Sequence, residues 1–200
     1  MRVRPLAVAG AYAFTPRRFA DRRGYFVSPF QEDAFHLAVG RRTLPVAQTN
    51  ISRSDLGVVR GIHFTATPPG QAKYVSCIGG RSRDFVVDLR IGSPTFGQWD
   101  TVILDQEDCR AVYLPVGVGH AFAAEEPDTV MSYLVSSAYV PENELAVDVR
   151  DPVLGLPLPP GAEDRLSERD TVAPTLAEAR AAGLLPTYEE AIRRERAQAG

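Results

Sequence analysis

The stretch Gly57-Val58-Val59-Arg60-Gly61-Ile62-His63-Phe64 decides how the rest of the chain is interpreted. Its apolar residues fall on both parities of an extended chain, so it predicts a buried strand that also carries an arginine and a histidine. Ionisable groups that lose their water need partners, and a partnered histidine in a cleft is a common catalytic base. The alternative is a core histidine that is satisfied by a backbone carbonyl.

The composition around this strand is that of an ordinary globular chain. Its 200 residues are 44% hydrophobic and 24% charged, which predicts one domain over residues 1–200 rather than two. The formal net charge of -3 argues against nucleic acid or an anionic membrane as a partner. No apolar run reaches membrane-spanning length and no signal-peptide core follows Met1, so we expect a cytoplasmic protein.

The cysteine and lysine content is informative. Cys77 and Cys109 have no CxxC spacing, which predicts neither a disulfide framework nor a structural zinc site. Lys73 is the only lysine among 22 basic residues. Codon bias in a GC-rich genome explains abundant arginine, but arginine cannot replace an ammonium where a compact charge with an adjustable pKa is required.

The chain before residue 140 has the pattern of short β-strands. Short strands without long helices between them predict a mainly β sandwich or barrel over about residues 10–140. Gly79-Gly80 predicts a hairpin between two of these strands. The expected strands are residues 10–14, 25–30, 44–52, 57–64, 72–78, 83–89, 98–104, 110–114, 120–123 and 129–136.

Helical composition is confined to two places. Residues 31–40 predict a helical turn or two. The C-terminal extension, about residues 141–200, is first proline-rich and then helical in composition over residues 176–200, with an interruption at Pro186. We expect this short helical tail to pack across the outside of the barrel.

A metal site is the first candidate chemistry. The sequence PVGVGH at residues 115–120 matches the P-x-G-x-x-H half-motif of cupin barrels. The other half-motif would supply an H-x-H pair and a glutamate, and it is absent around His63. His63 and His120 alone are too few ligands for the usual site, so we expect no metal; a metal-dependent cupin is the alternative.

Proton transfer is the second candidate chemistry, and it uses His63, Tyr133, Lys73 and Asp170. Abstraction of a proton next to a carbonyl needs a base, a phenol that can give or take a proton, and a cation for the developing oxyanion. Asp170 could orient the imidazole. The alternatives are a half-buried strand tyrosine for Tyr133 and a cap or surface carboxylate for Asp170.

Four motifs in order are similar to those of one enzyme family. They are GVVRGIH at residues 57–63, GSPTFGQW at 92–99, PVGVGHAF at 115–122 and LSERD at 166–170. Together they resemble the dTDP-4-dehydrorhamnose 3,5-epimerase family from about residue 10 to about residue 185. The resemblance implies a cupin-type jelly roll that acts on a dTDP-4-keto-6-deoxyhexose without metal or organic cofactor, and that works as a homodimer whose N-terminal strands reach the partner.

The resemblance also implies roles for individual residues. It makes His63 the base, paired with Asp170, and Tyr133 the acid on the opposite face of the sugar ring. Lys73 would lie near the keto oxygen. The implied substrate contacts are Arg23 and Arg60 to the diphosphate, Gln48 and Asn50 near the sugar, and Tyr139 near the thymine. His120 is, with Lys73, a candidate to stabilise the enolate oxygen, and Arg169 is a further candidate for substrate binding.

One geometric conflict follows from strand parity. In a regular strand Arg60 and His63 point to opposite faces, although the resemblance requires both near the ligand. A β-bulge at Gly61 would re-aim one of them.

Two residues depart from the pattern of the rhamnose pathway. Ser28 stands where a glutamate is usual near the nucleotide, and Thr65 where a glutamine often follows the aromatic residue. Together with Ser136-Ser137-Ala138 before Tyr139, these changes resemble epimerases of antibiotic deoxysugar pathways, some of which invert one carbon. They slightly favour inversion at C3 alone over C3 and C5. A dTDP-sugar ketoisomerase and a non-catalytic nucleotide-sugar-binding cupin are the remaining alternatives.

Overall fold

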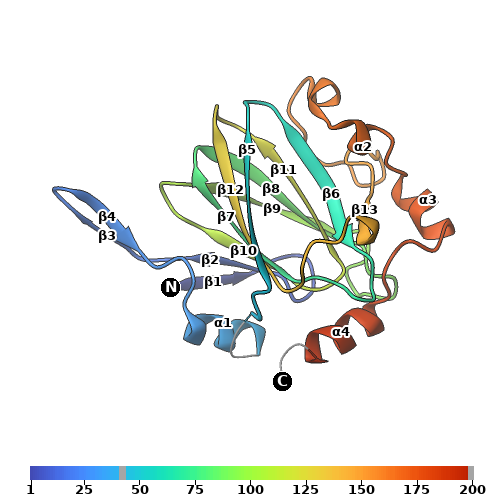
Figure 1. Ribbon diagram of the computed structural model, residues 1–200, viewed down its shortest axis with the longest axis horizontal. Coiled ribbons are helices and arrows are strands. Elements are labelled where there is room, and N and C mark those ends of the chain that lie inside the picture. Colours follow the sequence, from blue (N-terminus) through green and yellow to red (C-terminus); the bar gives the residue numbers. More distant parts are fainter. Residues whose placement is uncertain (41–43, 198–200) are drawn as a thin grey trace.

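The computed structural model describes residues 1–40 and 44–197, in which two antiparallel sheets face each other as a barrel (Figure 1). The six-stranded sheet has the order β1 (Arg2–Pro5), β2 (Tyr12–Thr15), β10 (Ala111–Leu114), β7 (Lys73–Gly79), β12 (Thr129–Val135), β5 (Gln48–Ser54). The five-stranded sheet has the order β13 (Glu144–Ala146), β6 (Val59–Thr65), β11 (Val118–Ala124), β8 (Arg81–Asp88), β9 (Trp99–Asp105). The expected mainly β cupin-type jelly roll is confirmed.

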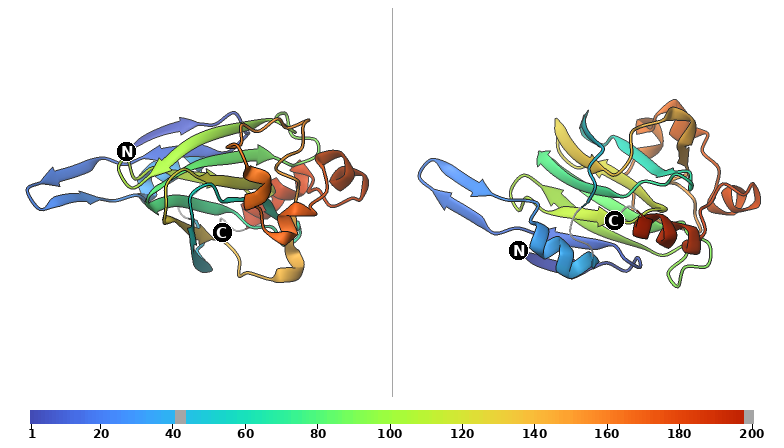
Figure 2. Two further views of the ribbon diagram at one scale, coloured as in Figure 1. Left: turned by 90° about the horizontal axis from the view of Figure 1, so that it is seen from above. Right: turned by 60° about the horizontal axis from the view of Figure 1, so that its bottom comes forward.

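The remaining elements lie outside the two sheets. Hairpin β3–β4 extends away from one side of the barrel, and the C-terminal segment lies along the opposite side (Figures 1 and 2). These elements are β3 (Arg18–Asp21), β4 (Gly24–Val27), α1 (Glu32–Val39), η1 (Pro141–Asn143), η2 (Ala162–Arg165), α2 (Glu168–Thr171), α3 (Leu176–Ala181) and α4 (Tyr188–Ala197). The two expected helical regions are confirmed within the described chain, since the expected end at residues 198–200 lies outside it.

The five-stranded sheet is buried on both faces because the C-terminal segment covers its outer side. Along β8, Phe85 and Val87 pack against tail residues such as Leu176, whereas Val86 between them faces the barrel interior with Phe122. This alternation is the two-residue period of a strand. The tail therefore packs across the outside of the barrel, as expected.

The expected Gly79-Gly80 hairpin is wrong. β7 and β8 belong to different sheets, so these glycines form a corner where the chain passes from one sheet to the other. Gly80 has φ +69, and a Cβ there would lie 2.9 Å from the Thr129 hydroxyl. The turn residues were identified correctly, but local sequence does not distinguish a hairpin within a sheet from a corner between sheets.

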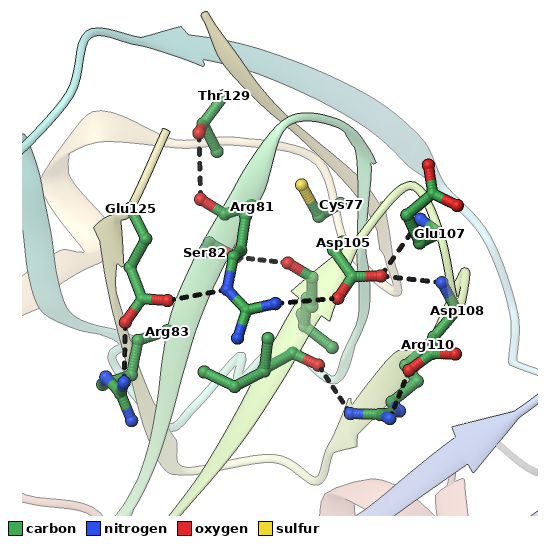
Figure 3. A network of polar contacts seen from close by, with 12 residues as sticks. Cys77, Arg81, Ser82, Arg83, Asp105, Glu107, Asp108, Arg110, Glu125 and Thr129 are labelled. Atoms are coloured by element: carbon green, nitrogen blue, oxygen red, sulfur yellow. Dashed lines mark hydrogen bonds and ion pairs between the residues drawn. The ribbon is translucent and has the colours of Figure 1, made fainter. Parts of the chain in front are cut away.

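A polar network fixes this corner (Figure 3). The Arg81 guanidinium donates to Glu125 at 3.0 Å and to Asp105 at 3.4 Å. The backbone carbonyl of Arg81 accepts a hydrogen bond from the Thr129 hydroxyl at 3.0 Å. Asp105 also accepts the backbone N–H groups of the turn after β9. The network joins the start of β8 to the neighbouring loops.

The GSPTFGQW motif has a structural explanation. Asp88 at the end of β8 is buried and accepts hydrogen bonds from Arg90, Ser93 and Thr95 at 2.6 to 2.9 Å. Burial alone would raise the pKa of Asp88, but these donors outweigh it and lower the pKa. The motif therefore closes the loop between β8 and β9.

Gly61 interrupts β6 with a bulge, as predicted. His120 of β11 lies opposite His63, but Phe122 lies opposite Arg60, so β6 has one residue more than β11 between these pairs. Gly61 has φ +117, and a Cβ there would approach the His120 carbonyl to 2.5 Å. Because of this extra residue, Arg60 and His63 border the same pocket despite their opposite parity.

Candidate active site

One pocket, with a volume of about 220 Å³, lies where side chains of the two sheets converge. The six-stranded sheet supplies Lys73 from β7 and Tyr133 from β12, while the five-stranded sheet supplies His63 from β6 and His120 from β11. The full lining is Asn50, Ile51, Ser52, Arg60, His63, Gln71, Lys73, His120, Phe122, Tyr133, Val135, Tyr139 and Glu144. A larger groove of about 730 Å³ beside α4 contains none of the expected site residues.

His63 and Asp170 form a dyad. Asp170 comes from α2, whose first N–H groups are capped by Ser167, and its carboxylate lies 2.6 Å from His63 Nε2. Asp170 is buried, which alone would raise its pKa, but the hydrogen bond and charge of His63 lower it. An ionised carboxylate only accepts hydrogen bonds, so it fixes the hydrogen on one imidazole nitrogen and leaves the other free to take a proton.

Tyr133 lies on the opposite sheet with its hydroxyl 3.3 Å from the Ser52 hydroxyl. Its ring packs edge-on against the imidazole of His120, with centroids 5.9 Å apart. Burial raises the pKa of Tyr133 to about 12. The phenol is therefore protonated at neutral pH and able to donate.

His120 belongs to a second histidine–carboxylate pair. Its Nε2 lies 2.6 Å from Asp84 Oδ2, and both side chains are buried. Burial raises the pKa of Asp84, and the charge and hydrogen bond of His120 oppose this shift. The pair orients the imidazole of His120 between β8 and β11.

Lys73 is the buried cation of the pocket, with 8% of its surface exposed. Burial lowers the pKa of its ammonium, the charge of Glu144 raises it, and the charge of Arg169 lowers it. Arg169 itself is exposed on α2 beside Asp170 and does not line the pocket.

The other expected contacts surround the pocket mouth. Arg60 donates to the Ser54 hydroxyl at 3.1 Å, which directs its guanidinium along the pocket edge. Gln48 does not line the pocket, but it donates to the Asn50 side chain at 2.6 Å and accepts from the Tyr139 backbone at 2.9 Å. Gln48 therefore holds two lining residues in place.

Arg23 is not brought to this pocket. It lies at the tip of hairpin β3–β4, with 81% of its side chain exposed and an ion pair to Asp21 at 2.6 Å. Ser28, directly after β4, is also outside the pocket lining. An arginine in this position can contact a diphosphate in the same pocket only if the hairpin moves or another copy of the chain supplies it.

Sequence reasoning missed four polar residues at or near the pocket: Ser52, Gln71, Asp84 and Glu144. Ser52 could have been found from its position two residues after Asn50 on the same strand. Asp84 and Glu144 carry no local signal, because their partners are 36 and 79 residues away.

Neither a metal-binding group of side chains nor a membrane-spanning helix is found among the described residues. Within residues 1–40 and 44–197, no group of three or more histidine, cysteine, aspartate or glutamate side chains is placed to hold a metal ion. In the same ranges, every helix is too short or too polar to cross a membrane.

Comparison with known proteins agrees with the geometry of the pocket. The family model described as dTDP-4-dehydrorhamnose 3,5-epimerase matches residues 5–178. A dTDP-4-dehydrorhamnose 3,5-epimerase of Mycolicibacterium smegmatis is 46% identical over 95% of this chain and 93% of its own length.

Two crystal structures have the same fold. A 4-keto-6-deoxy sugar epimerase from the novobiocin biosynthetic gene cluster of Streptomyces spheroides is 50% identical, with a TM-score of 0.92 over 96% of this chain and 95% of that one. A 3′-monoepimerase from Streptomyces bikiniensis, in complex with dTDP-quinovose, is 46% identical, with a TM-score of 0.90 over 97% and 98% of the two chains. The expected resemblance is confirmed: the chain belongs to the dTDP-4-dehydrorhamnose 3,5-epimerase family.

Proposed function

We propose that this protein is an isomerase that inverts C3, C5 or both in a dTDP-4-keto-6-deoxyhexose. The observation that carries the proposal is that His63 and Tyr133 reach one pocket from different sheets. Inversion of a carbon needs one group to remove a proton from one face and another to return a proton to the opposite face. A pocket with a base on one wall and a phenol on the other meets this requirement.

The reaction uses the acidity that the C4 ketone gives to its neighbouring carbons. His63, with its second nitrogen held by Asp170, takes the proton from C3 or C5, and the electron pair moves toward the ketone oxygen to form an enolate. Tyr133 then donates its hydroxyl proton to the other face of the same carbon. Solvent returns a proton to the phenolate and removes one from the imidazolium.

The enolate oxygen needs positive charge while it exists. Preorganised charge in a site that excludes water stabilises such an oxyanion far better than solvent does. Lys73 is the buried cation of the pocket, and His120 is the second donor. Arg60 would contact the diphosphate, Tyr139 the thymine and Asn50 the sugar.

The setting of the reaction is part of the proposal. The relatives include both 3,5-epimerases and 3-epimerases, and one comes from an antibiotic gene cluster. Ser28 and Thr65 favour an antibiotic deoxysugar pathway and inversion at C3 alone. A cytoplasmic location stays a prediction.

We also propose that the active form is a homodimer in which hairpin β3–β4 covers the partner's pocket. The hairpin extends away from its own barrel (Figures 1 and 2), and Phe19 and Phe26 on it are more than half exposed. A two-stranded ribbon with exposed aromatic side chains is marginal by itself and gains stability when another surface covers it. This arrangement would bring Arg23 of one copy to the diphosphate bound by the other.

Incubation with dTDP-4-keto-6-deoxyglucose in heavy water, followed by proton NMR of the sugar, tests the function. The wild-type enzyme should place deuterium at each carbon that it inverts, so the pattern also identifies the carbon.

His63→Ala should lower kcat by about 10²-fold or more with little change in dTDP affinity. EDTA treatment should leave the rate unchanged. Absence of deuterium from C3 and C5, or activity that requires added divalent metal, would overturn the proposal.

A further inference from the structure

Glu144 contributes a carboxylate to the pocket that the proposed reaction does not use. Among the described residues that line the pocket, it is the only acidic one. It lies on β13, a strand of three residues that follows the barrel and pairs with β6. An acidic group beside an enolate would be unfavourable unless it acts on a neighbouring cation.

The position of this carboxylate is fixed by its neighbours on β6. Glu144 lies directly opposite Thr65, and the Thr65 hydroxyl donates to Glu144 Oε1 at 2.9 Å. Two residues further along the same ladder, Ala146 lies opposite His63. Thr65 therefore holds Glu144 at a defined distance along the strand from the base.

Lys73 is the buried cation that lines the same pocket of about 220 Å³ as Glu144. Within the described chain its ammonium has no carboxylate within 4.0 Å, yet the side chain is buried, and a buried charge without a counter-charge tends to lose its proton. Burial lowers the pKa of Lys73, while the charge of Glu144 in the same pocket raises it and the charge of Arg169 lowers it. The other charged or titratable side chains that face the pocket are Arg60, His63, His120, Tyr133 and Tyr139.

We propose that Glu144, held by Thr65, is a positioning residue that keeps Lys73 as a charged ammonium inside the pocket. A neutral amine would leave the enolate oxygen without its nearest full positive charge. The contribution to catalysis rests on the proposed epimerase function, whereas the electrostatic effect on Lys73 is measurable in the protein without substrate.

The single lysine of the chain permits a direct measurement. Protein labelled with lysine that carries ¹³C at Cε gives one side-chain NMR signal, from Lys73, and the shift of that signal with pH reports protonation of the ammonium. In Glu144→Gln the titration midpoint should fall by about 0.5 to 1 pH unit, because an attracting charge is removed. Glu142→Gln is the matched control, since it removes the same charge from an exposed residue of the same segment and should leave the midpoint unchanged.

Variants of Thr65 change the position of the Glu144 carboxylate without removing its charge. Thr65→Val removes the hydroxyl that holds Glu144 and should lower the midpoint by part of the Glu144→Gln effect, and Thr65→Ser should restore the wild-type value. These variants also serve if Glu144→Gln does not fold. In the pH profile of kcat, the alkaline limb should move to lower pH in Glu144→Gln, and KM should be nearly unchanged.

The two proposals fail in distinguishable ways. An unchanged Lys73 midpoint in Glu144→Gln, or an equal fall in Glu142→Gln, would overturn the role of Glu144. A raised KM with an unchanged alkaline limb would also overturn it, because Glu144 would then bind the sugar directly. A lowered Lys73 midpoint in Glu144→Gln, together with no exchange at C3 or C5 by the wild-type protein, would support the electrostatic effect and overturn the epimerase function.

Discussion

At the scale of residues, the pocket gives His63 and Tyr133 different environments, which set different protonation states for the two side chains. His63 is partly exposed, with 31% of its side chain accessible, and is paired with an ionised carboxylate, so it can accept a proton. Tyr133 is partly buried, and burial raises its pKa to about 12, so it keeps its proton until an intermediate takes it. Groups whose environments separate their protonation states in this way are suited to act as base and acid.

Tyr133→Phe should separate the two halves of the reaction. Removal of the proton by His63 does not need the phenol, so the variant should still exchange the C3 or C5 proton with heavy water. Inversion should fall by about 10²-fold or more, because no acid remains on the opposite face. Proton NMR measures both quantities in one sample.

The matched control for this variant is Tyr12→Phe, which removes a phenol from the same sheet at a position outside the pocket. It should retain both exchange and inversion. If Tyr133→Phe inverts the sugar at the wild-type rate, Tyr133 is not the acid, and His120 or a bound water must supply the proton.

At the scale of elements, the bulge in β6 brings Arg60 and His63 to one pocket. Without the extra residue, Arg60 and His63 would lie on opposite faces of the sheet. Gly61 is required because its φ is +117 and because β11 approaches closely at His120 and Ala121. The same bulge places the Gly61 N–H 3.4 Å from Asp170, next to the dyad.

Gly61→Ala should therefore destabilise the fold by about 3 kcal/mol or more, from the positive φ and the overpacking together. The melting temperature should fall by roughly 5 to 10 °C, measured by circular dichroism. Gly161→Ala is the control, because Gly161 has φ +75 but open space around its Cβ, and it should lose much less. Equal losses in the two variants would contradict the close approach of β11.

At the scale of the whole molecule, the two ends of the chain have different tasks. The C-terminal segment packs on the outer face of the five-stranded sheet and, through Asp170 of α2, holds the imidazole of His63. The N-terminal hairpin extends from the opposite side and makes few contacts with its own barrel, such as the Tyr25 hydroxyl donating to the Gln106 carbonyl at 2.6 Å (Figure 1). The C-terminal segment thus supports the pocket within the chain, whereas the hairpin would act only in the proposed dimer.

Phe26→Ser should weaken the proposed dimer. Phe26 is 68% exposed on the hairpin, and the dimer would bury it, so its loss removes apolar area from the interface. Sedimentation velocity over a concentration series should show more monomer than in the wild type. Val153→Ser, at a residue 79% exposed outside the hairpin, should not change the distribution. A wild-type protein that sediments as a monomer at all concentrations would contradict the dimer.

The amino-acid sequence by itself determined most of the elements and most of the pocket. Strand periodicity and turn residues are local, so most strands and the helical tail could be predicted. The strands that were missed, β1, β3 and β13, are short and carry little apolar alternation. The chemistry of the residue types and the family resemblance identified His63, Tyr133, Lys73 and Asp170, and three of these line one pocket while Asp170 holds His63.

The tertiary structure alone decided the relations between distant segments. It placed β7 and β8 in different sheets, paired His120 with Asp84, set Glu144 opposite Thr65 and left Arg23 outside the pocket of its own chain. Each of these depends on contacts between residues far apart in sequence or between copies of the chain. Local patterns carry no information about such contacts, because loop closure and strand register are determined by how the whole core packs.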